Sequence, residues 1–158
     1  MRFFVSLCLF LPLMALAQED CPQLTGTFAS CVSTLQGADL TVQQFAITQQ
    51  GIQYTVVETD LSGKVTTENY TADGSTTTQT QDDPNYGQVV VTQQTSCVNN
   101  TVILASSSTV GGQPFFSMQQ VVSLNSSDQL VMAISAGNGS GSVQGLGSIT
   151  CSRVSAAQ

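Results

Sequence analysis

Apolar and polar residues alternate in short runs along most of this chain. Phe45 and Ile47 alternate with small or polar neighbours, and Tyr54 and Val56 alternate with mainly polar ones in the next run. A period of two predicts β-strands, because successive side chains of a strand point to opposite faces. No window shows a sustained helical period, and Gly, Asn and Asp turns separate the runs. The pattern predicts about ten strands, at residues 24–29, 43–49, 52–59, 64–71, 75–81, 88–96, 101–108, 115–124, 129–135 and 144–152.

The connections between these runs are short enough for each strand to pair with the next one along the chain. This favours an all-β fold, an antiparallel up-and-down meander of about 8–10 strands. An open meander would expose two edge strands, so we expect the sheet to close into a barrel. The alternative is a β-sandwich, which an unpaired first and last strand would indicate.

One face of the predicted strands is apolar and would point inward. Such a face either packs into a solid core or leaves a lumen for one small apolar ligand, and both alternatives remain open. The residues that we expect to line a ligand-binding lumen are Phe28, Phe45, Ile47, Tyr54, Val56, Phe116, Met118 and Met132.

The N-terminus has the features of a cleavable signal peptide. Arg2 precedes an apolar run that ends in small residues at Ala15 and Ala17, and the run is shorter than a membrane span. We therefore expect cleavage after Ala17 and a single domain over residues 18–158, secreted or periplasmic and without a membrane span.

The expected mature chain is acidic. Lys64 and Arg153 are its only cations against ten acidic residues, a net charge of −8. Two cations cannot form the basic patch that phosphate backbones require, so nucleic acid is excluded as a partner. We expect a monomer whose partner is a small hydrophobic ligand or an unknown protein.

Four cysteines remain after the expected cleavage, which predicts two disulfides in an exported domain. We expect Cys21 and Cys31 to flank the first strand, with the last strand antiparallel beside it. Cys151 would then lie near Cys21, which leaves Cys31 to pair with Cys97. A bridge between Cys21 and Cys31 is the alternative if the segment bends at Gly26.

Catalytic groups are sparse. Histidine is absent, so a Ser or Cys nucleophile has no usual base, and we expect no enzyme, cofactor or metal site. Glu58 and Asp60 share a strand face, as a glycosidase acid pair would, but a solvated strand end explains them more simply. Asp82 and Asp83 lie in a turn cluster without the spacing of a calcium loop.

Four Asn-x-Ser/Thr sequons begin at Asn69, Asn99, Asn125 and Asn138. The last three lie in predicted turns where glycans could be attached in a eukaryotic source, and a bacterial source would leave all four bare.

The segment Leu24-Thr25-Gly26-Thr27-Phe28, followed by the hairpin sequence from Ile47 to Tyr54, resembles the lipocalin-like (calycin) barrels exported by bacteria. Those barrels begin with Gly-x-Trp, whose aromatic ring plugs the barrel base. Phe28 stands at the Trp position, and Arg153 matches the basic partner near the chain end. The resemblance implies binding of a small apolar molecule or simply a stable exported barrel. Some exported protease inhibitors share this barrel, so an adhesin-like or inhibitor-like role is the alternative.

Overall fold

The structure is a computed structural model that describes residues 21–36, 41–139 and 143–154. The expected signal peptide and its cleavage site after Ala17 lie outside the described residues. The ten strands are β1 (Gly26–Ser33), β2 (Val42–Gln50), β3 (Gln53–Asp60), β4 (Val65–Thr71), β5 (Asp73–Asp83), β6 (Gly87–Val98), β7 (Thr101–Val110), β8 (Gln113–Leu124), β9 (Leu130–Gly137) and β10 (Gln144–Arg153).

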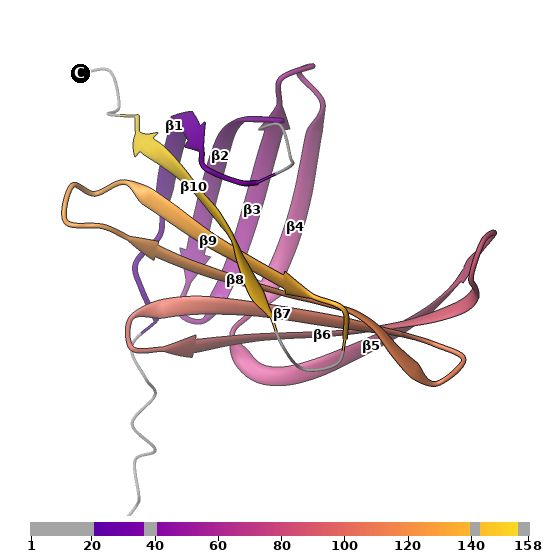
Figure 1. The fold of residues 1–158 in the computed structure, drawn as a ribbon. Helices are drawn as coiled ribbons and strands as arrows, with labels where there is room; N and C mark the ends of the chain where they lie inside the picture. Colours follow the sequence, from indigo (N-terminus) through magenta and orange to yellow (C-terminus); the bar gives the residue numbers. More distant parts are fainter. Residues whose placement is uncertain (1–20, 37–40, 140–142, 155–158) are drawn as a thin grey trace, which may run out of the picture.

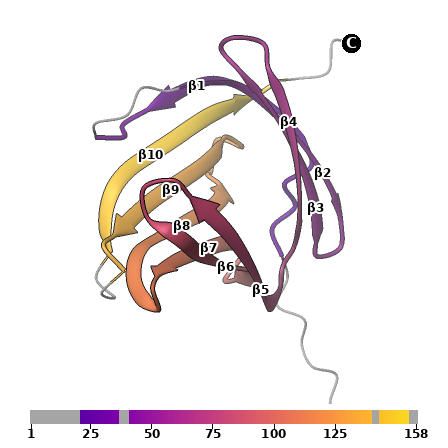
Figure 2. The same ribbon diagram turned by 90° about the vertical axis from the view of Figure 1, so that its right-hand side faces the viewer.

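All ten strands belong to one antiparallel sheet in the order β4-β3-β2-β1-β10-β9-β8-β7-β6-β5. The first strand pairs with the last one, β1 with β10, which bends the sheet into a nearly closed barrel (Figures 1 and 2). The predicted all-β barrel is therefore confirmed. Because β1 and β10 are paired, the condition for the sandwich alternative is not met.

The barrel is interrupted between β4 and β5, where a simple meander would have formed a hairpin. Ala72 is buried, and its amide donates a hydrogen bond to the carbonyl of Ile52 (2.9 Å), so this residue stays against β3. Gly74 then adopts a positive φ of 76°, and the chain turns away to pair with β6 alone. Residues of β5 are polar on both faces and exposed, so no apolar face draws this strand back against β4.

The disulfides join Cys21 to Cys97 and Cys31 to Cys151. The predicted pairs, Cys21–Cys151 and Cys31–Cys97, are wrong, and so is the alternative Cys21–Cys31 bridge. The strand begins at Gly26, so Cys21 lies in a segment before it and reaches the end of β6. Cys31 lies within β1 at an irregularity in its register with β10, and is thereby placed against Cys151.

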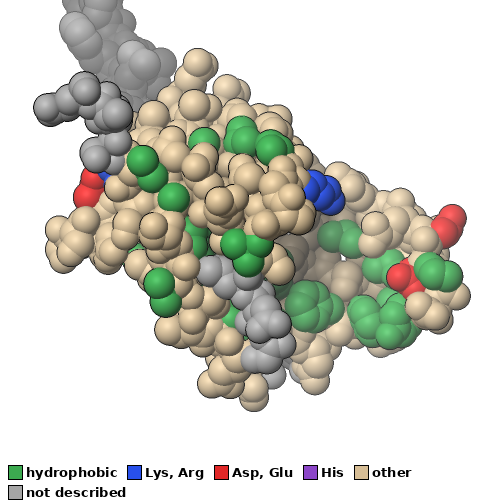
Figure 3. Space-filling view, turned by 90° about the horizontal axis from the view of Figure 1, so that it is seen from above, with side chains coloured by type: hydrophobic (Ala, Val, Ile, Leu, Met, Phe, Trp, Pro, Cys, Tyr) green, Lys and Arg blue, Asp and Glu red, His purple; other side chains and the backbone are tan. Residues whose placement is uncertain are grey.

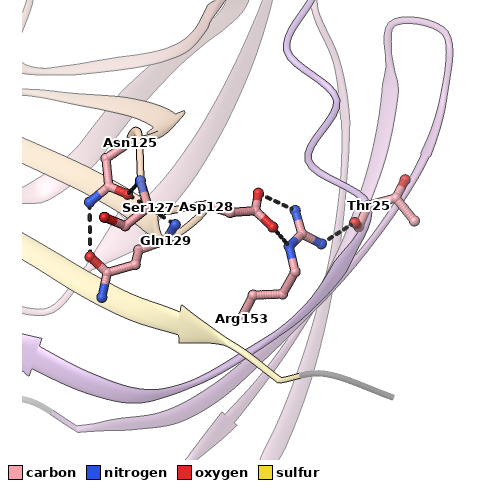
Figure 4. Close-up of polar contacts among 6 residues, drawn as sticks. All are labelled: Thr25, Asn125, Ser127, Asp128, Gln129 and Arg153. Carbon is pink, nitrogen blue, oxygen red and sulfur yellow. Dashed lines mark hydrogen bonds and ion pairs between the residues drawn. The ribbon is translucent and has the colours of Figure 1, made fainter. Parts of the chain in front are cut away.

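One end of the barrel is closed by residues 21–25 together with Phe28 and Arg153, and we call this the closed end. Phe28 is fully buried, and the guanidinium of Arg153 lies 4.6 Å from the centre of its ring. The same guanidinium pairs with Asp128 at 2.5 Å and donates to the carbonyl of Thr25 at 2.7 Å (Figure 4). A Cβ at Gly26 would overlap this guanidinium, so the absence of a side chain there makes room for it.

The Asp128 carboxylate is presented by a tight turn between β8 and β9. The side-chain oxygen of Asn125 accepts hydrogen bonds from the amides of Ser127 (2.9 Å) and Gln129 (3.1 Å) (Figure 4). This Asx-type turn is a common use of an asparagine side chain and leaves Asp128 with a positive φ of 57°. The turn, β10 and the segment before β1 are thus joined through one arginine.

Candidate functional site

The barrel encloses a cavity of about 280 Å³ on its inner face, which we call the lumen cavity. Apart from Leu24, which precedes β1, its lining residues come from β2–β4 and from β7–β10. Alternate residues of each of these strands point inward. Most of the lining is apolar: Leu24, Val42, Phe45, Ile47, Tyr54, Val56, Val102, Leu104, Val122, Leu130, Met132, Ile134 and Ile149. The inner face is therefore only partly filled by its own side chains.

Four further residues give the lumen cavity a polar side: Glu58, Glu68, Tyr70 and Gln120. The register explains how β3 and β4 bring the first three together. Glu68 is the cross-strand partner of Val56, and Glu58 lies two residues further along the same inward face of β3. The hydroxyl of Tyr70 donates a hydrogen bond to the carboxylate of Glu68. This places two carboxylates side by side on one wall.

Glu58 is the more shielded of the two carboxylates. Its partial burial raises its pKa above the ordinary value, and the nearby negative charges of Glu68 and Asp60 raise it further. Among the described residues, the Glu58 carboxylate receives no hydrogen bond and pairs with no cation. The lumen cavity thus holds an acidic group whose ionised form has no counter-charge from the residues that the structure describes.

Asp60 has a different role from Glu58, although the two lie on the same strand. Its carboxylate accepts hydrogen bonds from the hydroxyl of Ser62 (2.6 Å) and the amides of Lys64 (2.9 Å) and Ser62 (2.8 Å), which together lower its pKa. Asp60 therefore caps the turn between β3 and β4. The expectation of a solvated strand end fits Asp60, whereas Glu58 faces the lumen.

Tyr54 lines the cavity with its ring, while its hydroxyl points to the closed end. The hydroxyl donates to the carbonyl of Pro22 (3.2 Å) and accepts from the side-chain amide of Gln49 (3.1 Å). Burial raises the pKa of Tyr54 to about 12. Since Gln49 also accepts from the amide of Leu24 (2.8 Å), this network fixes the segment before β1 across the barrel end.

The lumen cavity continues into a groove between β4 and β6. The groove, of about 510 Å³, shares Glu68, Tyr70, Leu104 and Gln120 with the lumen cavity. Its other lining residues are mainly Thr, Ser, Gln and Asn side chains. The interruption of the barrel at β4 and β5 therefore gives the lumen a polar lateral entrance.

The residues predicted to line a lumen fall into several places. Those that line the lumen cavity are Phe45, Ile47, Tyr54, Val56 and Met132. Met118 lines the groove instead, and Phe28 is buried at the closed end without lining the cavity. Phe116 is 42% exposed and lines a hollow with Tyr86 and Phe115 outside the lumen cavity, so its predicted place in the lumen is wrong.

Sequence reasoning did not assign Glu58, Glu68, Tyr70 or Gln120 to the lumen. A signal existed for Glu58, which has the same parity as Tyr54 and Val56 on its strand. A carboxylate in an inward position is unusual and would have indicated a polar site.

The projecting end of β5–β8 carries exposed aromatic side chains. Tyr86 is 53% and Phe115 is 43% exposed, and their ring centres are 4.8 Å apart. Figure 3 shows hydrophobic side chains gathered at this end of the molecule. Gln81, Asp83 and three serines of β7 lie around them. This second apolar surface is separate from the lumen cavity.

Comparisons with known proteins give no assignment: neither a protein-family model nor a curated protein matches this sequence. Within the described residues, no helix has the length and apolar character needed to cross a bilayer. Two disulfides are typical of proteins that fold in an oxidising compartment.

Proposed function

We propose that this protein is a secreted or periplasmic, lipocalin-like barrel that binds one small, mainly apolar molecule in its lumen. The observation that carries the proposal is the lumen cavity of about 280 Å³, whose walls are largely aliphatic and aromatic. Ligand pockets are typically concave and apolar with a few polar groups that fix orientation, and this cavity has that composition.

The arrangement at the closed end supports the lipocalin-like relationship. Phe28 takes the place of the aromatic plug, Arg153 packs over its ring, and Gly26 leaves the space that the guanidinium occupies. These are the residues on which the sequence resemblance depends. Their contact is a physical reason for the Gly-x-aromatic pattern and the basic residue near the chain end.

Native mass spectrometry of the protein purified from its own source tests this proposal. A retained small molecule, lost on denaturation, is the expected result. A protein that carries no adduct from its source and also takes up no small apolar molecule in titration would refute the proposal.

A second candidate function is binding of a protein partner at the projecting end. The exposed pair Tyr86 and Phe115 favours it, because aromatic residues are enriched in interfaces. It makes a different prediction: replacing both rings by serine would abolish partner binding and leave the uptake of small molecules into the lumen unchanged.

A further inference from the structure

We propose that the lumen ligand carries a positively charged amine, which the carboxylates of Glu58 and Glu68 bind while its apolar part occupies the lumen cavity. This inference rests on the proposed function, since it specifies the ligand class of the same cavity. It concerns an amphipathic cation, an alkyl or aryl amine, and not a neutral lipid or a fatty acid.

The lining of the cavity suits the apolar part of such a ligand. Leu104, Met132, Ile134 and Val56 line a space that the protein's own side chains leave open. Transfer of an alkyl chain from water to such walls is favourable by about 0.8 kcal/mol per buried CH₂. This contribution would retain any small apolar molecule and does not select its head group.

The selection comes from the charges around the cavity. Glu58 and Glu68 both line it, and Asp60 is close enough to raise the pKa of Glu58. Glu68 is exposed and Glu58 is partly buried, so a carboxylate ligand would add a further negative charge beside Glu58, where solvent screens it less. An ammonium would instead supply the opposite charge and donate up to three hydrogen bonds.

The part of the chain that the structure describes provides no cation that could take this role itself. Among the described residues the cations are Lys64 and Arg153. Arg153 is paired with Asp128 at the closed end, and Lys64 is exposed in the turn that Asp60 caps. Neither forms an ion pair with Glu58 or Glu68. The position that faces the two carboxylates is therefore left for a ligand.

The remaining polar groups fit the same head group. The hydroxyl of Tyr70 donates a hydrogen bond to the carboxylate of Glu68 and so orients this carboxylate before a ligand binds. Gln120 lines both the lumen cavity and the groove, so its side chain lies where the two meet. An ammonium placed beside Glu68 can stay in contact with the wet groove while its chain lies in the lumen.

Three eight-carbon probes of one length test the inference: octylamine, octan-1-ol and octanoate, each titrated calorimetrically into the full chain at neutral pH. We expect octylamine to bind about tenfold tighter than octan-1-ol, because charge-assisted hydrogen bonds exceed neutral ones. Octanoate should bind more weakly than the alcohol. This comparison needs no variant, so it does not depend on the folding of any substitution.

Two single substitutions, each of which removes one negative charge, locate the residues that produce the preference for the amine. Glu58→Gln should remove most of the preference for the amine over the alcohol and leave alcohol binding unchanged. Asp82→Asn removes one charge from exposed β5, which does not line the lumen cavity, and should keep the preference. A double variant, Glu58→Gln/Glu68→Gln, removes both carboxylates of the cavity. A preference for the amine over the alcohol that survives in this double variant, or that is lost in Asp82→Asn, would overturn the inference.

The outcomes separate this inference from the proposed function. Equal binding of amine and alcohol to the native chain, or tighter binding of octanoate, overturns the amine assignment and leaves the apolar lumen supported. Absence of binding by all three probes overturns the amine assignment and the proposed function together.

Discussion

Removing the Cys21–Cys97 disulfide should destabilise the protein strongly, because this bridge closes a long loop and holds the closed end. The two cysteines are separated by 76 positions in the sequence. Loop-closure entropy assigns such a crosslink about 4.5 kcal/mol at 25 °C. The separation of 120 for Cys31–Cys151 gives about 4.9 kcal/mol, so the entropic effects of the two bridges are nearly equal.

The two bridges differ in what surrounds them in the native state. Cys151 is fully buried within β10, which pairs with β1, whereas Cys21 lies before the first strand and is only partly buried. Loss of Cys21–Cys97 therefore releases a segment whose other anchors are the hydrogen bonds at Pro22, Leu24 and Thr25 and the burial of the Leu24 side chain. Loss of Cys31–Cys151 also leaves two unbridged groups inside the strand pair that completes the barrel, so it should cost more.

Urea unfolding followed by far-ultraviolet circular dichroism measures both effects. We expect Cys21→Ser/Cys97→Ser to lose about 4 kcal/mol of unfolding free energy, and Cys31→Ser/Cys151→Ser to lose more. The double variants leave no free thiol from the removed bridge. A loss below about 1 kcal/mol for Cys21→Ser/Cys97→Ser would refute the reasoning, because the unfolded chain would then gain little freedom from the cut.

Further predictions concern the closed end and the acidic wall. Phe28→Ala should cost about 3–5 kcal/mol in urea unfolding, because it removes a fully buried ring; a loss under 1 kcal/mol would contradict the role of Phe28 as the barrel plug. Gly26→Ala should displace the guanidinium of Arg153 and lower the unfolding free energy by about 1–3 kcal/mol, as overpacking does; unchanged stability would show that the overlap is relieved at no cost. Glu58→Gln should raise the free energy of unfolding of the ligand-free protein at pH 7. Because the pKa of Glu58 is raised in the folded state, Glu58 favours folding at low pH, and this stabilisation is lost as the pH rises through that pKa. The gain should disappear below pH 4, and a variant less stable than the native chain at pH 7 would contradict the placement of Glu58 in the lumen.

The strands and their closure could be predicted from the sequence because each depends on a local pattern. Alternation in runs such as residues 43–49 locates a strand within one or two positions, and turn residues mark where it ends. Closure followed from the number of strands and from the need to protect edges. The interruption of the barrel between β4 and β5 did not follow from these arguments, because β5 has no apolar face and pairs on one side only.

The disulfides show where sequence reasoning about distance fails. The prediction placed Cys21 and Cys31 at opposite ends of a first strand over residues 24–29, yet β1 runs from Gly26 to Ser33 and therefore contains Cys31. This longer strand brings Cys31, and not Cys21, against Cys151. Boundaries of short strands are the least certain part of a sequence pattern, and a pairing that depends on them inherits the error.

The candidate site was predictable only for its apolar part. Parity along β3 places Tyr54 and Val56 in the lumen, and the same parity would have placed Glu58 there. Sequence alone could not bring Glu68 beside Glu58, because this depends on the register between β3 and β4. The position of Phe116 depends on where the barrel wall ends, which no local pattern records.

Ligand binding in the lumen is the central claim, and stabilisation by octan-1-ol tests it most directly. A ligand that binds only the folded state raises the unfolding free energy by about 2.7 kcal/mol at a concentration one hundred times its Kd. Leu104→Trp should abolish this stabilisation by filling the cavity, whereas Ile103→Trp, on the opposite face of β7, should retain it. Equal stabilisation of both variants, or none in the native chain, would contradict a ligand-binding lumen.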